Sequence, residues 1–210
     1  MLNKINFKSL YSSGENDSPI SFFTDALSNS ISFDFGLGFF SSASFNVLSI
    51  GFAKFISNGG KMRLYINQYL SEEDYEIFTS HPDIVENKVI DSFTSMLNVL
   101  TKRDKQFFNC LSYLIYTNRI EVKIVIPNSG GIAHQKFGIF TDAAKNKVSF
   151  IGSLNLTASA LLSKNIESIS CNSSWKGAAE TINDYQQLFD KYFSGDKEGI
   201  TVIPANRLTK

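Results

Sequence analysis

Two short runs of polar residues in this 210-residue chain combine side chains that can do acid–base chemistry. One run reads His-Gln-Lys over 134–136, and the other reads Gly-Ser-Leu-Asn over 152–155. A histidine and a lysine two positions apart on one strand project from the same face. Two apolar stretches, 137–140 and 148–151, lie between the runs and flank turn residues at 145–147. This pattern predicts a β-hairpin whose open end carries both polar runs.

This combination suits cleavage of a phosphodiester without a metal ion. Because imidazole titrates near neutral pH, His134 can attack phosphorus, and a second imidazole can protonate the leaving oxygen. A lysine supplies a fixed positive charge, while Ser153 and Asn155 supply hydrogen-bond donors for the non-bridging oxygens as negative charge accumulates on them. We therefore expect His134, Lys136 and Asn155 to act in catalysis. The residues expected to bind the substrate are Lys136, Ser153 and Asn155.

Each of these residues also has a purely structural interpretation. A single histidine on a strand is more often a hydrogen-bonded core or edge residue, and Ser153 with Asn155 could simply form a turn after a strand. Lys136, however, lies in an apolar stretch, where an unpaired charge is costly. Its presence two residues after His134 favours the functional interpretation.

The two runs resemble the signature of the phospholipase D superfamily, which is written H-x-K, then an aspartate, then G-S/G-x-N. The residues that match it are His134, Lys136, Gly152, Ser153 and Asn155. Asn165 and Glu167 fit the asparagine and glutamate that often follow on the next strand. The family's aspartate usually falls five residues after the lysine, where this chain has Thr141, and Asp142 comes one position later. In the family this aspartate supports structure near the site, so the resemblance leaves the role of Asp142 open.

The resemblance implies a double displacement at phosphorus that requires two histidines. The chain has one H-x-K run, and its other histidine, His81, precedes Pro82 and has no lysine two residues later. We therefore expect a homodimer in which His134 of each subunit meets its mate across a two-fold axis. One His134 would form a phosphohistidine, and the other would act as general acid and then as base. Glu167 would orient a histidine through its second ring nitrogen, or would simply be a charge on an exposed strand. No metal ion or cofactor is expected.

The expected function is that of a metal-independent phosphodiesterase, a nuclease, with DNA favoured over RNA. The runs 152–161, 164–168 and 174–175 are similar to nuclease-like modules of bacterial DNA-processing, helicase-associated and restriction proteins, which implies a helicase or restriction partner. Two alternatives stay open. A phospholipase or phosphatidyltransferase usually carries two motifs in a longer chain, often with membrane segments or a signal peptide. A catalytically weak nucleic-acid-binding or targeting module of a larger assembly fits the late Asp142 and the neutral charge.

Composition limits how the chain can bind nucleic acid. The formal net charge is zero, so any contact with nucleic acid must depend on a local patch of charge. The basic residues that could form such a patch are Lys102, Arg103 and Lys105 in one segment and Lys136, Lys145, Lys147 and Lys164 around the motifs. The two cysteines lack metal-ligand spacing, so neither a zinc site nor a disulfide framework is expected. No long apolar run or signal sequence is present, and we expect a cytoplasmic protein without a membrane segment.

The pattern of elements predicts one α/β domain over residues 1–210, a phospholipase-D-like α-β-α sandwich with a mixed, largely parallel sheet. A content of 43% hydrophobic residues with 19 phenylalanines is enough for one substantial core. The expected course is an irregular segment over 1–20, strands over 30–40, 61–66 and 120–126, and helices over 45–56, from 71–74 onward, over 90–100 and over 105–116. It continues with a hairpin connection at 127–131, a motif region over 132–171 whose last strand is 167–171, and a closing helix over 178–193.

Overall fold

The computed structural model of this chain describes residues 1–67, 76–77, 105–132 and 134–207. The described elements are η1 (Leu2–Lys4), β1 (Leu10–Ser12), α1 (Pro19–Ser28), β2 (Ser32–Leu37), α2 (Ala43–Val47), α3 (Ser49–Ser57), β3 (Lys61–Ile66), α6 (Lys105–Tyr116), β4 (Ile120–Pro127), β5 (Phe137–Thr141), β6 (Lys147–Gly152), α7 (Ala158–Leu161), β7 (Ser168–Ser173), η3 (Ser174–Lys176), α8 (Ala179–Ser194), β8 (Ile200–Pro204) and η4 (Ala205–Arg207). The helices expected from 71–74 onward and over 90–100, together with His81, Lys102 and Arg103, lie outside the described residues.

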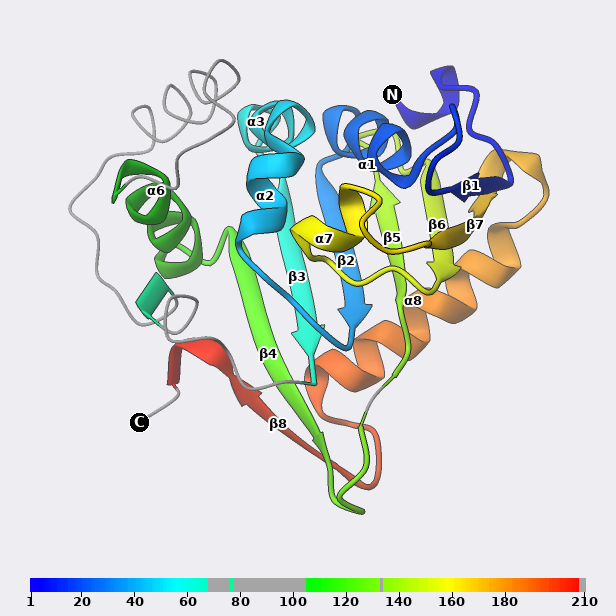
Figure 1. Cartoon of the computed structure of the whole chain (residues 1–210). Coiled ribbons are helices and arrows are strands. Elements are labelled where there is room, and N and C mark those ends of the chain that lie inside the picture. Colours follow the sequence, from blue (N-terminus) through cyan, green and yellow to red (C-terminus); the bar gives the residue numbers. More distant parts are fainter. Residues whose placement is uncertain (68–75, 78–104, 133, 208–210) are drawn as a thin grey trace.

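The described strands form one mixed eight-stranded sheet in the order β1-β7-β6-β5-β2-β3-β4-β8 (Figure 1). The predicted α/β class and mixed sheet are confirmed, but the sheet is not largely parallel. Only β2, β3 and β4 pair in parallel, whereas the other neighbouring pairs of described strands are antiparallel. The reason is that parallel strands need a long crossover connection. Such connections join the strands of the first half of the chain, while β5 and β6 are joined by a tight turn.

Helices cover both faces of the sheet, as predicted, but unequally. Helices α1, α2, α3 and α6 lie on one face, and α8 crosses the other face (Figure 1). The first face is packed with aliphatic and aromatic side chains, and the aromatic ones include Phe22, Phe23, Phe33, Phe35, Phe140 and Phe150. The residues packed on the face of α8 are Tyr65, Val125, Phe137 and Ile139 of the sheet with Ile182, Phe189 and Phe193 of the helix. Among the described helices, none is both long and apolar enough to cross a membrane.

The first twenty residues differ from the prediction. They are not irregular, because they contain η1 and β1, and α1 begins at Pro19. Strand β1 pairs antiparallel with β7 at one edge of the sheet. Leu2, Phe7 and Tyr11 are buried in the core on the face of α1. A strand of three residues is too short to produce a readable alternation of polar and apolar positions, so the sequence pattern could not reveal it.

Most other boundaries agree with the sequence. Strand β3 and helix α6 have the predicted bounds, and the hairpin of β5 and β6 has the predicted pairing. The expected helix over 45–56 is divided at Leu48 into α2 and α3. The strand expected over 30–40 is shorter, because β2 ends at Leu37.

The expected hairpin connection at 127–131 is wrong. Strands β2 and β3 lie between β4 and β5 in the sheet, so β4 and β5 do not pair. After a turn in which Gly130 has φ +76°, the chain passes along the carboxyl ends of β3 and β2. It then enters β5, which runs antiparallel to β2. This path brings His134 to the carboxyl edge of the parallel strands.

A partly buried ion pair fixes α8 on the sheet. Asp34 of β2 is buried and accepts hydrogen bonds from Nε and Nη2 of Arg63 on β3, at 2.8 and 2.6 Å. Gln186 of α8 donates to the same carboxylate at 2.8 Å, and Asp190 of α8 accepts from Arg63 at 2.9 Å. The guanidinium lies 5.0 Å from the ring centroid of Phe189. The hydrogen bonds to Asp34 raise the pKa of Arg63 further above its usual range, although burial acts in the opposite direction.

We predict that Asp34→Asn lowers the free energy of unfolding by about 2 to 3 kcal/mol, because it leaves a partly buried guanidinium without its main counter-charge. The matched control is Asp190→Asn, whose side chain is half exposed and should cost less than about 1 kcal/mol. Urea unfolding of both variants and the wild type measures the difference. Equal losses in the two variants would contradict the assignment of Asp34 as the centre of this contact.

Candidate active site

The His-Gln-Lys run lies just before β5 rather than within the strand as predicted. The amide of Gly152 still donates to the carbonyl of Lys136 at 3.1 Å, so the hairpin pairing continues one step beyond the end of β5. His134 is exposed, whereas the side chain of Lys136 is buried. Nζ of Lys136 lies 3.5 Å from Nε2 of His134 and donates to the His134 carbonyl at 3.1 Å. The predicted juxtaposition of imidazole and ammonium is therefore present.

The second polar run turns back to the same edge of the sheet because Gly152 allows a close approach to β7. A Cβ on Gly152 would lie 2.1 Å from the carbonyl oxygen of Ser168, so no other residue fits without moving the backbone. Immediately afterwards, the amide of Ser153 donates to that carbonyl at 3.2 Å, and the amide of Ser168 donates to Oγ of Ser153 at 3.2 Å. Register and sterics together fix where Ser153 lies.

Ser153, which is exposed, pairs with the buried Glu167 beside the lysine. Oγ of Ser153 donates a short hydrogen bond to Oε2 of Glu167, which is only 8% exposed. Glu167 is thus not a charge on an exposed strand face. Burial lowers the pKa of Lys136, while the negative charge of Glu167 acts in the opposite direction. In this arrangement the Ser153 hydroxyl donates its proton to Glu167. It would have to give up this hydrogen bond in order to donate to a phosphoryl oxygen.

The N-terminal segment holds Glu167 in place, which the sequence did not suggest. The amide of Ser13 donates to the Glu167 carbonyl at 2.9 Å, and the amide of Glu167 donates to Oγ of Ser13 at 3.1 Å. These reciprocal bonds extend the pairing of β1 with β7 by one residue. No local signal could reveal this contact, because the two residues are 154 positions apart.

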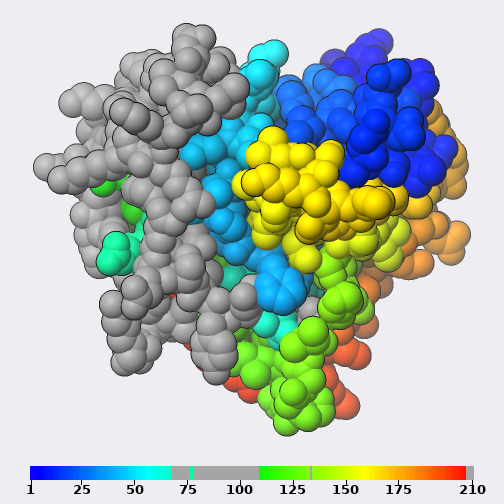
Figure 2. All heavy atoms as spheres, viewed as in Figure 1, coloured from blue at the N-terminus to red at the C-terminus, as the bar shows by residue number. Residues whose placement is uncertain are grey.

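Asn155 connects the site to the segment after β2. Its Oδ1 accepts from the amide of Phe39 at 3.0 Å. Since this bond occupies the carbonyl end of the side-chain amide, the Nδ2 group remains as the donor that a substrate oxygen could use. Figure 2 shows the loop containing α7, in yellow, beside the segment after β2, in blue, and the segment that precedes β5, in green. The candidate site is formed where these three segments meet at the carboxyl edge of the sheet, the position at which α/β sheets commonly bind ligands.

Asp142 lies at the opposite end of the hairpin from His134. Its Oδ1 accepts from the amides of Ala144 and Asn146, both at 2.9 Å. Its Oδ2 accepts from Nδ2 of Asn146 and from the amide of Leu2, again at 2.9 Å. Burial alone would raise the pKa of Asp142, but these hydrogen bonds outweigh it and hold the pKa below its ordinary value. Asp142 therefore stabilises the turn and the N-terminus and does not contact the candidate site.

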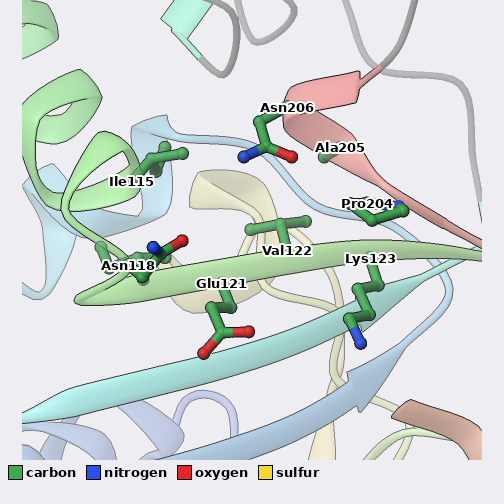
Figure 3. A pocket seen from close by; sticks show the side chains of 9 residues that line it. Ile115, Asn118, Glu121, Val122, Lys123, Pro204, Ala205 and Asn206 are labelled. Atoms are coloured by element: carbon green, nitrogen blue, oxygen red, sulfur yellow. The ribbon is translucent and has the colours of Figure 1, made fainter. Parts of the chain in front are cut away.

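Other features of the described residues do not belong to the site. A cavity of about 200 Å³ opens beside β4, between the end of α6 and η4 (Figure 3). Ile115, Asn118, Glu121 and Asn206 are among the residues that line it, and it shares no residue with the candidate site. Within the described part of the chain, no group of three or more His, Cys, Asp or Glu side chains could hold a metal ion.

We predict that Asp142→Asn destabilises the protein by about 2 kcal/mol at pH 7, because four hydrogen bonds to a carboxylate are weakened. The pKa of this group is lower in the folded state than in the unfolded state, so its contribution is present above the unfolded pKa of about 4. The contribution is lost as the pH falls through the folded pKa, and the wild type and variant should then converge. Urea unfolding between pH 7 and pH 3 tests this, with the exposed Asp17→Asn as control; a difference that is constant with pH would count against it.

Comparisons with known proteins agree with this fold. A family model described as "Cardiolipin synthase, PLD-like domain" matches residues 63–193, more than half of the chain. No curated protein matches the chain. NucT from Helicobacter pylori is similar in structure, with a TM-score of 0.50 and 16% identity over 88% of this chain and 90% of that one.

Two further solved structures are similar at low identity. A phosphatidylserine synthase from Haemophilus influenzae has a TM-score of 0.54 and 10% identity over 98% of this chain, which spans 43% of that protein. Nuc from Salmonella typhimurium, described as a phospholipase D family member, has a TM-score of 0.49 and 13% identity over 87% of this chain and 93% of that one. At such identities the structural likeness to NucT and to the phosphatidylserine synthase shows the fold. The family is shown by the sequence match: the chain belongs to the phospholipase-D-like family.

Proposed function

We propose that the protein is a metal-independent phosphodiesterase that cleaves nucleic acid, with DNA as the favoured substrate. The observation that supports this most directly is the exposed imidazole of His134 beside the buried ammonium of Lys136, 3.5 Å apart. Asn155 adds an amide donor from the facing loop. A nucleophile with a fixed positive charge and a neutral donor suits phosphoryl transfer, where charge accumulates on the non-bridging oxygens.

The proposed reaction has two displacements at phosphorus. His134 of one subunit attacks, the P–N bond forms, and the P–O bond to the leaving group breaks while His134 of the partner subunit gives that oxygen a proton. The partner's histidine then takes a proton from water, and the water oxygen displaces the first histidine from phosphorus. Lys136 and Nδ2 of Asn155 stabilise the five-coordinate transition state. Oε2 of Glu167 is bonded to Ser153, and we assign Oε1 to orienting a histidine.

The second histidine is the reason for proposing a homodimer. Large apolar side chains are exposed on the segments that carry the site, and their exposed fractions are 43% for Phe39, 63% for Ile132, 52% for Leu162 and 92% for Ile166. Phe39 bonds to Asn155 through its amide, and Ile166 directly precedes Glu167. Apolar side chains gathered around a polar site suit an interface between two copies, and a two-fold axis there would bring both His134 side chains together.

A phospholipase or phosphatidyltransferase is the second candidate, because the same apolar side chains could contact lipid. The description of the matching family model names cardiolipin synthase, and one similar structure is a phosphatidylserine synthase. A nucleic-acid-binding module without useful catalysis, with a helicase or restriction partner, also stays a prediction.

We predict that the wild type cleaves plasmid or single-stranded DNA in excess EDTA and that His134→Ala reduces the rate by about 10³-fold or more. Because His134 is exposed, the variant should keep its fold, which circular dichroism can check. The control is His81→Ala, which should cleave like the wild type. Parallel assays with RNA and with phosphatidylglycerol vesicles identify the substrate. Cleavage that requires added metal, or that survives in His134→Ala, would refute the proposal, and hydrolysis of lipid alone would select the second candidate.

We predict that the wild type sediments as a dimer and that Ile166→Asp dissociates it and abolishes cleavage, since a carboxylate cannot be buried unpaired in an apolar interface. Ile50→Asp is the matched control, because Ile50 is 55% exposed on α3; this variant should keep both the dimer and the activity. Sedimentation velocity measures the assembly. A wild-type monomer with full activity would show that the two-histidine arrangement is wrong.

A further inference from the structure

Tyr65 reaches the His-Gln-Lys run from the opposite face of the sheet. It lies on β3, is fully buried, and packs on the face of α8, with ring centroids 5.4 Å from both Phe189 and Tyr192. Its pairing partner on β2 is Gly36, where a Cβ would lie 2.2 Å from Cζ and Oη of Tyr65. The phenol ring therefore occupies the space that a side chain at position 36 would fill. This glycine allows a tyrosine of β3 to extend across β2 toward the start of β5.

At the end of this path the hydroxyl of Tyr65 donates to Oε1 of Gln135, at 3.5 Å. Successive side chains in extended chain point to opposite faces, so Gln135 points toward α8 while His134 and Lys136 point to the site. Burial raises the pKa of Tyr65, and the nearby Tyr192 adds to the effect. The phenol thus remains protonated and able to donate at neutral pH.

The segment that carries His134 needs such an anchor. In the turn that precedes this segment, the last described backbone bond runs from the Gly130 amide to the Pro127 carbonyl. The hairpin pairing begins again at the carbonyl of Lys136. Between these points, the described contacts are those of Nζ of Lys136 with His134 and of Tyr65 with Gln135. The lysine ammonium is itself expected to bind substrate and is a poor fixed support. The tyrosine is held by packed rings and does not have this conflict.

We propose that Tyr65 is a positioning residue for the active site: through Gln135 it holds His134 and Lys136 from behind the sheet. Gln135, the middle residue of the H-x-K run, then has a structural role of its own, because it accepts the hydrogen bond from Tyr65. This inference rests on the proposed function only for its effect on catalysis, because the anchoring itself is a structural property. A shift of the nucleophile by a fraction of an ångström is enough to slow an in-line attack.

The test compares Tyr65→Phe, Gln135→Leu and their combination with the wild type. Each single change removes the same hydrogen bond and should lower kcat about fivefold to tenfold with little change in KM. The double variant should be no slower than either single variant, because the two residues act as one unit. Tyr192→Phe is the matched control, since it removes a hydroxyl from the adjacent ring and should keep the wild-type kcat. A wild-type kcat in Tyr65→Phe, or additive losses in the double variant, would overturn the proposal.

A second measurement does not depend on cleavage. The chain has only two histidines, so the imidazole Cε1–H region of a proton–carbon NMR spectrum contains two signals, and His134→Ala assigns them. Tyr65→Phe and Gln135→Leu should both shift or broaden the His134 signal, whereas Tyr192→Phe should not. If the wild type cleaves no substrate, the proposed function fails, but this spectrum still shows whether Tyr65 positions His134. A His134 signal that is unchanged in Tyr65→Phe would then overturn it.

Discussion

The antiparallel pairing of β5 with β2 determines where every polar residue of the candidate site lies. Parallel strands β2, β3 and β4 all end at one edge of the sheet. Because β5 runs against β2, it begins at that edge, β6 ends there, and β7 begins there. His134 precedes β5, Asn155 follows β6 and Glu167 precedes β7. One change of strand direction therefore gathers three separate sequence positions at one edge, where long-range contacts such as that of Ser13 with Glu167 then hold them.

Close backbone approach is the second requirement, and glycine meets it on both sides of the site. Gly152 permits contact with the carbonyl of Ser168, which brings Ser153 to Glu167. Gly36 leaves room for the ring of Tyr65 beneath the other half of the site. In both places a methyl group would collide with a neighbour that packing or pairing holds in place. The positions of the polar side chains therefore depend on having glycine, which has no side chain, at positions 36 and 152.

The hairpin and its polar end could be predicted because their signals are local. Alternation, a turn and two short motifs are enough to place the His-Gln-Lys run and the Gly-Ser-Leu-Asn run at the same end of the hairpin, where Gly152 bonds to Lys136. The contributions of the N-terminus could not be predicted in this way. Ser13 holds Glu167 and Leu2 holds Asp142 across 154 and 140 residues, and in each contact a backbone amide, which carries no sequence signature, donates to a side-chain oxygen. The position of Asp142 follows the same logic, since β5 ends at Thr141 and the aspartate falls in the turn, where its carboxylate satisfies amide groups.

The burial of Lys136 explains how a chain with no net charge could bind a phosphodiester. Among the described residues, no carboxylate lies within ion-pair distance of its ammonium, and the charge of Glu167 offsets only part of the cost of burial. A buried cation interacts with an anion more strongly than a surface lysine does, because water screens the interaction less. An anionic phosphoryl group beside His134 would supply the missing counter-charge. In the proposed function, one desolvated lysine would supply a local positive charge for the phosphoryl group, which is consistent with equal numbers of acidic and basic residues in this sequence.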